Sequence, residues 1–238
     1  VGGLLTMETQ AQTLSHKGPK RVSPFTVPMM IPNMASGLAA IALGAKGPSS
    51  SVSTACAAGS NAIGDSFRLL QLGKADAMIC GGAEASITPL GVAGFASAKA
   101  LSFRNDSPQT ASRPFDAQRD GFVIGEGSGI LILETLEHAK NRGAKIYAEI
   151  VGYGTTCDAH HITSPSPGGS GGAAAIKLAL EDASLEIDKV DYINAHGTST
   201  MKGDAIELEA VSRLFKHDIF VSSTKSSIGH LLGAAGSV

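Results

Sequence analysis

Short apolar runs alternate with segments of helical spacing along most of this chain, and glycines separate them. The pattern predicts strands at residues 49–54, 75–80, 127–134, 146–153, 190–194 and 219–221. It predicts helices at residues 33–45, 60–72, 135–142, 172–183 and 204–215, a final helix near Gly229, and irregular structure over residues 1–30. Alternating strands and helices indicate an α/β fold with buried apolar strands. A soft boundary near Gly143 divides the chain into residues 1–143 and 144–238.

The composition argues against several classes of function. Lys and Arg number 19 against 21 Asp and Glu, so charge gives no reason to expect nucleic acid. Three cysteines without paired spacing argue against a disulfide framework and against a zinc site, and we expect no metal. The weakly polar run at residues 34–45 is too short to span a membrane. We expect a soluble, cytoplasmic protein, cut at both ends.

Cys56 is the first candidate for chemistry. It lies in Ser53-Thr54-Ala55-Cys56, between a predicted strand and a predicted helix. A helix N-terminus favours the thiolate, which is the nucleophilic form of cysteine. The alternative is a buried, inert cysteine, which is the commoner case. Cys80 and Cys157 are predicted to be inert thiols of the core.

Two histidines are the next candidates. His196 follows a predicted strand, at the edge where α/β proteins bind ligands, and His230 begins a predicted buried helix. Desolvation and the helix dipole would lower the pKa of His230, and a neutral imidazole can donate to a developing oxyanion. His196 could instead be a hydrogen-bonded structural residue. Lys225 precedes His230 by five residues, and it could be a solvated surface lysine. Glu207, on the predicted helix after His196, is a candidate partner for these residues.

Four patterns resemble other kinds of site but do not meet the requirements of those sites. Ser222 to Lys225 matches Ser-x-x-Lys without the companion motifs of a penicillin-binding acyltransferase. The glycine-rich segment 168–172 lacks the Lys of a phosphate loop, and the segment 125–129 precedes a strand where a dinucleotide fingerprint must follow one. His160 and His161 are adjacent, which is a poor spacing for a shared metal.

Seven blocks of sequence together resemble the β-ketoacyl-acyl carrier protein synthases, in particular the elongating type II-like enzymes of the thiolase superfamily. The resemblance covers essentially all 238 residues. The blocks are Ser53-Thr54-Ala55-Cys56, Gly81-Gly82-Ala83-Glu84, Ser112-Arg113-Pro114-Phe115-Asp116, Arg119-Asp120-Gly121-Phe122, Gly125-Glu126-Gly127, Asn194-Ala195-His196-Gly197-Thr198-Ser199-Thr200, and Ser222-Ser223-Thr224-Lys225 with Gly229-His230.

The resemblance implies a thiolase-like fold, in which two related α/β halves pack as five layers (αβαβα), here incomplete at both termini. Residues 1–143 would be the C-terminal part of the first half, and residues 144–238 the N-terminal part of the second. It also implies a homodimer that condenses a Cys-bound acyl chain with malonyl-acyl carrier protein. No cofactor is implied, because phosphopantetheine arrives on the carrier protein.

The resemblance also assigns roles to single residues. Cys56 would carry the acyl chain, His196 and His230 would stabilise the enolate, and Lys225 and Glu207 would form a supporting ion pair. We expect the sulfur of Cys56 to lie within reach of both imidazoles. Thr163, Ser164, Thr198 and Thr200 would bind the phosphopantetheine arm. Phe95 and Val1 would line the acyl pocket, and Lys20, Arg21 and Lys99 would face the acidic carrier protein.

Two departures from the family pattern limit these expectations. The family's first strands and its C-terminal glycine-rich loop have no counterpart here, so we expect these 238 residues alone to lack condensing activity, with sheet edges left open. Met201 stands where the family usually has Pro. Two alternatives stay open: a ketosynthase of a type II polyketide pathway, and a non-catalytic fragment that binds a carrier protein. The acyl chain length is not indicated.

Overall fold

The computed structural model describes residues 2–238, a mixed α/β chain whose contacts divide it into two compact units. The first unit runs to Ala98 and also contains Ile124–Ile146 and Leu231–Val238. The second contains Lys99–Val123 and Tyr147–His230. The units are therefore interleaved along the chain. The boundary predicted near Gly143 separates the two halves of the expected fold and not these two units. It stays a prediction.

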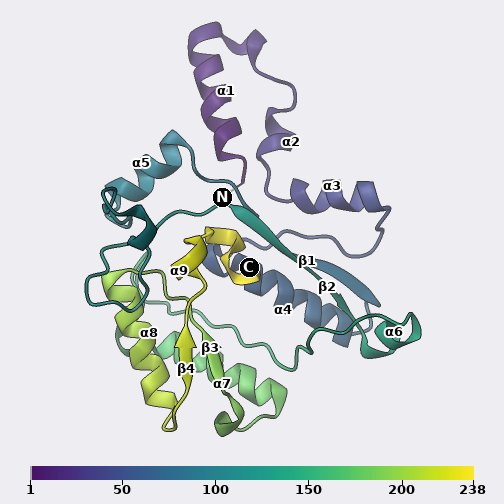
Figure 1. Ribbon diagram of the computed structural model, residues 1–238. Helices are drawn as coiled ribbons and strands as arrows, with labels where there is room; N and C mark the ends of the chain where they lie inside the picture. Colours follow the sequence, from purple (N-terminus) through teal and green to yellow (C-terminus); the bar gives the residue numbers. More distant parts are fainter. Residues whose placement is uncertain (1) are drawn as a thin grey trace. The chain divides into compact units, whose positions relative to one another are not determined.

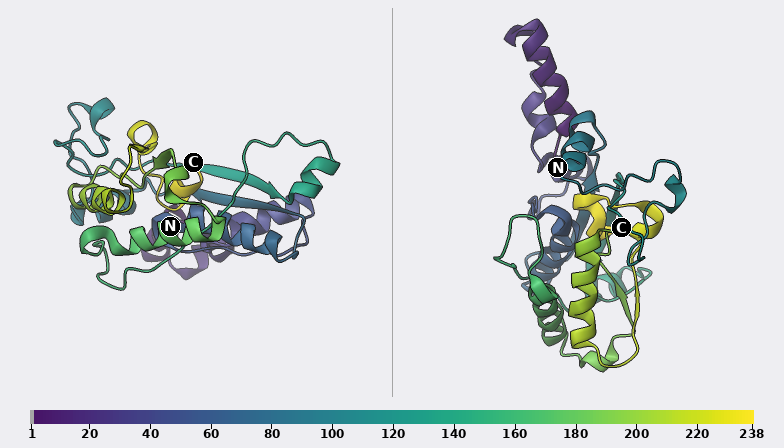
Figure 2. Two further views of the ribbon diagram at one scale, coloured as in Figure 1. Left: turned by 90° about the horizontal axis from the view of Figure 1, so that it is seen from below. Right: turned by 90° about the vertical axis from the view of Figure 1, so that its left-hand side faces the viewer.

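Two antiparallel strands and one long helix form the centre of the first unit (Figures 1 and 2). Strand β1 (Ala77–Glu84) pairs with β2 (Gly127–Glu134), so that Ala77 lies opposite Glu134. Helix α4 (Ala58–Gln71) packs along β1. The sequence predicts both strands and this helix. Strand β1 continues through Gly81 and Gly82, which were expected to end it, because both glycines keep partners on β2.

Glycines make the surface on which the C-terminal segment of this unit packs. The 3₁₀ helix η6 (Leu232–Ser237) contacts α4, β1 and β2. A Cβ atom on Gly82 would lie 2.7 Å from the carbonyl oxygen of Gly233, and one on Gly129 would lie 2.0 Å from that of Ser237. Only glycine allows this close approach of backbones. The buried Glu84 accepts a hydrogen bond from the backbone N–H of Gly233 at 3.1 Å.

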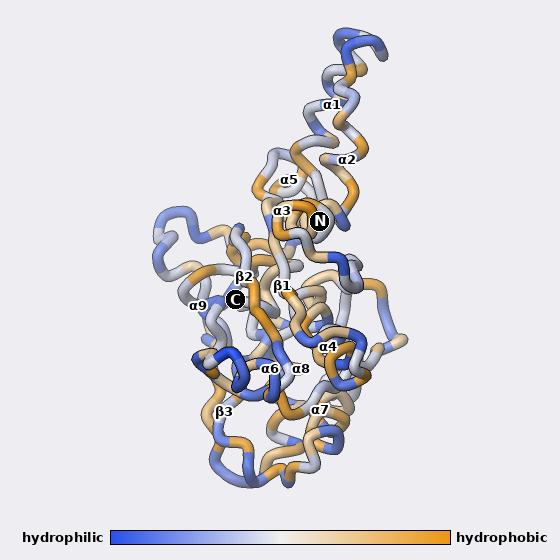
Figure 3. The backbone as a smooth tube through the Cα atoms, turned by 90° about the vertical axis from the view of Figure 1, so that its right-hand side faces the viewer, coloured by the Kyte–Doolittle hydropathy of each residue, from blue (hydrophilic) through white to orange (hydrophobic). Residues whose placement is uncertain are grey.

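The irregular structure expected over residues 1–30 is wrong, since this segment contains α1 (Leu4–Lys17), the 3₁₀ helix η1 (Pro19–Arg21) and α2 (Thr26–Met30). Its prolines do not break these helices, because Pro19 begins η1, Pro24 precedes α2, and Pro28 lies in the first turn of α2, where proline is tolerated. Helices α1 and α2 lie side by side in Figures 1 and 3, followed by the predicted helix α3 (Met34–Leu43). The unit also contains α5 (Pro89–Ser97), which the pattern did not predict, and α6 (Leu136–Asn141).

The second unit contains a short parallel pair of strands and two packed helices. Strand β3 (Tyr192–Asn194) pairs with β4 (Phe220–Ser222), and α7 (Ser170–Ala183) contacts α8 (Met201–Leu214). The short helix α9 (Lys225–Ile228) follows β4. The remaining elements are the 3₁₀ helices η3 (Pro108–Thr110), η4 (Pro167–Gly169) and η5 (Ile187–Lys189). Helix α9 ends before Gly229, so the final helix predicted there is displaced.

The strands predicted at residues 49–54 and 146–153 are wrong, because neither segment joins a ladder. A strand needs a neighbouring strand to pair its backbone groups. The second segment lies instead against α7, where a Cβ on Gly152 would come within 2.2 Å of the carbonyl oxygen of Ala179. The N–H of Tyr153 donates to the carboxylate of Asp182 on α7 at 2.8 Å. Among residues 2–238, we find no helix that combines the length and hydropathy needed to cross a bilayer.

Candidate active site

Cys56 lies at the point where the chain enters a long helix. The 3₁₀ helix η2 (Ala55–Ala57) leads directly into α4, and the thiol-bearing residue is half-buried. Ala55 has φ +50°, a left-handed conformation that is uncommon for a residue with a side chain. The hydroxyl of Thr54 donates to the side-chain oxygen of Asn61 at 2.7 Å, which ties the turn to the helix. The helix start predicted for Cys56 is confirmed.

The second unit brings two imidazoles together. His196 follows β3, and His230 follows α9 and is buried. Their ring centroids are 5.3 Å apart with the rings nearly perpendicular, and a ring nitrogen of each lies within 4.8 Å of one of the other. Phe122 packs against the ring of His230, with centroids 5.2 Å apart. The backbone N–H of His230 donates to the carbonyl of Val123 at 2.7 Å, which fixes its position.

Both imidazoles are held in the neutral form. Desolvation lowers the pKa of His230 to about 3, with smaller contributions from His196 and from the Lys225 cation. The pKa of His196 falls to about 4, again chiefly through desolvation and then through Lys225. His196 is open to solvent on one side, but the protein packed around its ring removes enough water to disfavour the charged form. The predicted lowering of the His230 pKa by desolvation is confirmed, whereas the further contributions come from His196 and Lys225 and not from a helix dipole.

Lys225 and Glu207 support this pair by different routes. Lys225 is buried, with 6% of its surface exposed, and its charge acts on both rings. The carboxylate of Glu207 accepts the backbone N–H groups of His196 at 2.6 Å and Gly197 at 2.8 Å. The predicted ion pair between Lys225 and Glu207 is absent among residues 2–238, where the two carboxylate oxygens of Glu207 accept backbone N–H groups instead. Glu207 therefore positions His196 directly.

The hydroxyls predicted to bind the phosphopantetheine arm lie on two segments. The hydroxyls of Thr198 and Thr200 are 3.1 Å apart, and Thr198 is buried. Thr163 and Ser164 both donate their backbone N–H groups to Nδ1 of His161 at 3.1 Å, which fixes a tight turn. Lys202 joins the two segments, since its Nζ donates to the hydroxyl of Ser164 at 3.1 Å. Their role in binding the arm stays a prediction.

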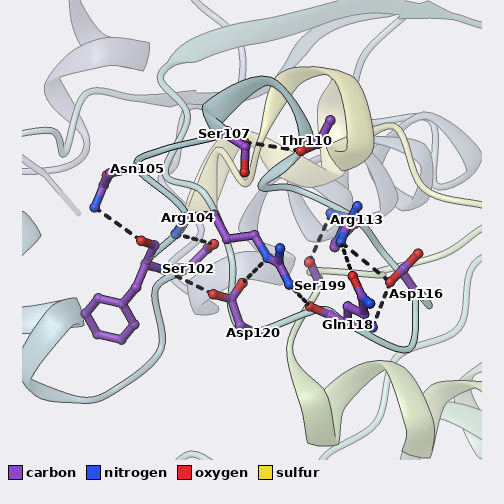
Figure 4. A network of polar contacts seen from close by, with 11 residues as sticks. Ser102, Arg104, Asn105, Ser107, Thr110, Arg113, Asp116, Gln118, Asp120 and Ser199 are labelled. Atoms are coloured by element: carbon purple, nitrogen blue, oxygen red, sulfur yellow. Dashed lines mark hydrogen bonds and ion pairs between the residues drawn. The ribbon is translucent and has the colours of Figure 1, made fainter.

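A polar network that the sequence reasoning missed holds the loop between His196 and Thr200, and Figure 4 shows the contact of Ser199 with Arg113 that belongs to it. Ser199 is fully buried with φ +71°, and its hydroxyl accepts the backbone N–H of Arg113 at 3.1 Å. Asp204, 1% exposed, accepts the N–H of Phe115 at 2.8 Å and pairs with Arg119 at 3.6 Å. The sequence offered one signal for this network. The blocks around Arg113 and Arg119 resemble the family, but no role was assigned to their residues.

Most of the remaining predicted site residues lie on the surface. Lys20, Arg21 and Lys99 are exposed, and Phe95 on α5 is half-buried. Val1 lies outside the described residues. The roles of these residues stay predictions. So does the expected approach of the Cys56 sulfur to the two imidazoles.

The other two cysteines differ from each other. Cys80 is buried on β1, and burial raises the pKa of its thiol, so the expected core thiol is confirmed. Cys157 is exposed, so its predicted place in the core is wrong. Residues 151–159 around it form no strand that could bury it.

Comparison with known proteins decides the family. The beta-ketoacyl synthase N-terminal domain matches residues 1–139, and the beta-ketoacyl synthase C-terminal domain matches residues 147–238. The chain belongs to the beta-ketoacyl synthase family. This ketosynthase chain is 63% identical over 241 aligned positions to 3-oxoacyl-[acyl-carrier-protein] synthase 2 of Synechocystis sp.. It is 56% identical over 242 positions to the protein of that name from Staphylococcus aureus.

Solved ketosynthases share the fold. A beta-ketoacyl synthase from Burkholderia phymatum matches 99% of this chain with a TM-score of 0.93 and 42% identity. A type II polyketide ketosynthase, solved with its acyl-carrier protein and bound to a hexaketide, matches 98% with a TM-score of 0.94 and 38% identity. The predicted thiolase-like fold is therefore confirmed. The chain spans 58% and 60% of the two curated relatives, and 57% and 59% of these two solved chains.

Proposed function

We propose that the protein containing this chain is a β-ketoacyl-acyl carrier protein synthase that extends a fatty acyl chain by two carbons. The observation that carries the proposal is the pair of neutral imidazoles of His196 and His230 beside the buried Lys225 cation. Neutral imidazoles can donate hydrogen bonds to the oxyanion of a thioester enolate without help from a metal.

In the first half-reaction, the thiolate of Cys56 attacks the thioester carbonyl of an acyl-carrier protein. A new carbon–sulfur bond forms on Cys56, and the phosphopantetheine thiolate leaves and takes up a proton. Thiolates suit this exchange because sulfur both attacks and leaves readily. The place of Cys56 at the start of α4 favours the thiolate, since the unpaired N–H groups there are electropositive.

In the second half-reaction, malonyl-acyl carrier protein loses CO2, and the electron pair of the broken carbon–carbon bond forms an enolate. His196 and His230 donate to the enolate oxygen. The carbanion then attacks the carbonyl of acyl-Cys56, a carbon–carbon bond forms, and the Cys56 thiolate is expelled. The product is a β-ketoacyl chain on the carrier protein, two carbons longer than the starting acyl chain.

The second candidate is a ketosynthase of a type II polyketide pathway, which uses the same chemistry. The solved polyketide ketosynthase of nearly identical fold favours it. The curated synthases 2 share 56–63% of their residues with this chain, against 38% for the polyketide enzyme, so fatty acid elongation is supported better.

We further propose two partners, acyl carrier protein and a second copy of this chain. The exposed basic residues Lys20, Arg21 and Lys99 suit an acidic carrier. Large apolar side chains are exposed on and beside α1, α2 and α3, and surfaces of this kind mark interfaces. They include Leu5, Leu14, Phe25, Met29, Leu38 and Ile41. The lack of disulfides in residues 2–238 suits the reducing cytoplasm, where we place the enzyme.

Mass spectrometry of the full-length protein tests the proposal. After incubation with acyl-carrier protein, we expect the acyl mass on Cys56 and its loss when malonyl-carrier protein is added, with release of a β-ketoacyl product. Cys157→Ser is the matched control, because it removes an exposed thiol, and it should leave both steps intact. Acylation of Cys157 instead of Cys56, or an acyl-enzyme that never condenses, would refute the proposal. Binding of the carrier without acylation would favour the non-catalytic alternative.

A further inference from the structure

Lys202 stands between the two segments that carry the hydroxyls predicted to hold the phosphopantetheine arm. It is the second residue of α8, and its Nζ donates to the hydroxyl of Ser164, 38 positions earlier in the chain, at 3.1 Å. Thr200, two residues before it, contacts the hydroxyl of Thr198. The ammonium group is exposed, so a ligand in solution can reach it.

The charge of this ammonium group is not matched by a carboxylate. Within the described part of the chain, Lys202 makes no ion pair. The acidic groups nearest to it on α8 are committed elsewhere. Asp204 is buried and binds Phe115 and Arg119, and both oxygens of Glu207 accept backbone N–H groups. A net positive charge therefore remains beside Ser164.

The hydrogen bond also leaves donors available at this point. Because the oxygen of Ser164 accepts from Lys202, the hydroxyl proton of Ser164 can be donated to a further acceptor. The ammonium group keeps two more N–H donors. The backbone turn around Nδ1 of His161 fixes the position of Ser164. An anionic oxygen placed here would receive hydrogen bonds from both side chains.

We propose that Lys202 and Ser164 bind the phosphate group of the phosphopantetheine arm. This inference rests on the proposed function, which brings the arm to these hydroxyls. The phosphodiester is the one anionic group of the arm itself, and Lys binds phosphate as a point charge. Lys202 would thus raise the affinity for phosphorylated carriers and take no part in the chemistry at Cys56.

Paired substrates test this role in the full-length, acyl-loaded protein. The substrates are malonyl-pantetheine and malonyl-4′-phosphopantetheine, which differ only in the phosphate. For Lys202→Gln we expect kcat/KM to fall about fivefold with the phosphorylated thioester, which is ~1 kcal/mol, and to stay unchanged with the other. Lys202→Arg should keep most of the preference. Lys216→Gln is the matched control, since it removes an exposed lysine just beyond the other end of α8.

A binding measurement separates this inference from the proposed function. Calorimetry with 4′-phosphopantetheine and with pantetheine needs no turnover, and we expect the phosphate to tighten binding about fivefold in the wild type but not in Lys202→Gln. Inorganic phosphate serves as a third ligand, and equally tight binding of it would assign the site to free phosphate instead of the arm. An equal loss with both thioesters, or a loss only with malonyl compounds, would refute the proposal and point to the malonyl carboxylate.

Discussion

The buried pair of Asp204 and Arg119 gives the sharpest test of how the His196–Thr200 loop is held. We consider Asp204→Asn, which keeps the shape of the side chain and removes its charge. Asp204 is 1% exposed and Arg119 is 12% exposed, and their nearest charged atoms are 3.6 Å apart. One carboxylate oxygen of Asp204 accepts the N–H of Phe115, and the other finds no hydrogen bond among the described residues.

The expected cost follows from these contacts. Unpairing a buried charge typically costs about 3–5 kcal/mol. Arg119 would keep three backbone carbonyl partners, on Asp116, Thr200 and Met201, at 2.6–3.0 Å, so part of its desolvation stays compensated. If the oxygen of the new amide keeps the hydrogen bond from the Phe115 N–H, its NH2 group takes the place of the second carboxylate oxygen, where no hydrogen-bond partner lies among the described residues. Leaving that buried donor unsatisfied costs about 1–3 kcal/mol. We therefore expect Asp204→Asn to lose about 3 kcal/mol in the free energy of unfolding.

Hydrogen exchange at the Phe115 amide reports this loss locally, and urea unfolding followed by circular dichroism reports it globally. A loss of ~3 kcal/mol corresponds to exchange faster by about two orders of magnitude. Glu209→Gln is the control on the same helix, because its partner Arg213 lies 3.0 Å away with both side chains over half exposed, and we expect less than about 0.5 kcal/mol. Unchanged protection of Phe115 in Asp204→Asn would refute the reasoning, as would an equal cost for Glu209→Gln.

Two further predictions concern the glycine surface and the imidazoles. Gly82→Ala should destabilise the first unit by about 1–3 kcal/mol in thermal unfolding, because the new Cβ would meet the Gly233 backbone. Gly94→Ala in α5 is the control, since its Cβ meets no other atom and the change should be neutral or stabilising. Equal effects of the two changes would argue against the packing of η6. Folding lowers the pKa of His230 to about 3, so the unfolded state binds more protons than the folded state between pH 6.5 and 3. The free energy of unfolding should therefore decrease as the pH falls through that window, and His230 should not affect it above pH 6.5. NMR of the His230 ring should show no titration from pH 8 to 5, and a midpoint near 6.5 would contradict the buried environment.

The sequence predicted elements well where periodicity and glycine ends coincide. Helix α4, strand β2 and helix α6 lie within two residues of their predicted positions. It failed where tertiary partners decide the structure. Residues 49–54 have strand-like composition but no neighbouring strand, and residues 146–153 satisfy backbone groups through α7. Helices α1 and α2 were missed because the prolines and scattered charges of residues 1–30 suggested irregular structure, although α1 contains no proline and Pro28 lies in the first turn of α2.

The residues proposed to react could be singled out from the sequence, but the groups that hold them could not. A sequence pattern can mark Cys56, His196 and His230 as candidates, because few residue types can act as nucleophile or oxyanion donor. The groups that hold them use ordinary chemistry. Ser199 and Asp204 act through single hydrogen bonds to a segment more than eighty residues away, and no local pattern encodes such a contact. The wrong partner for Glu207 has the same origin, since its backbone acceptors are visible only in three dimensions.

These supports also hold the buried cation beside the two imidazoles. Lys225 disfavours protonation of both rings, so its position helps to keep them as neutral donors. Because a buried cation is costly unless it is paired and hydrogen-bonded, the backbone of Lys225 has to be held in place. The hydroxyl of Ser112 donates to the backbone carbonyl of Lys225 at 2.5 Å, and residues 113–119 hold Ser199, Thr200 and Asp204. One segment, residues 112–119, therefore fixes both the cation and the loop that carries His196. The pKa of the two imidazoles consequently depends on how this segment packs.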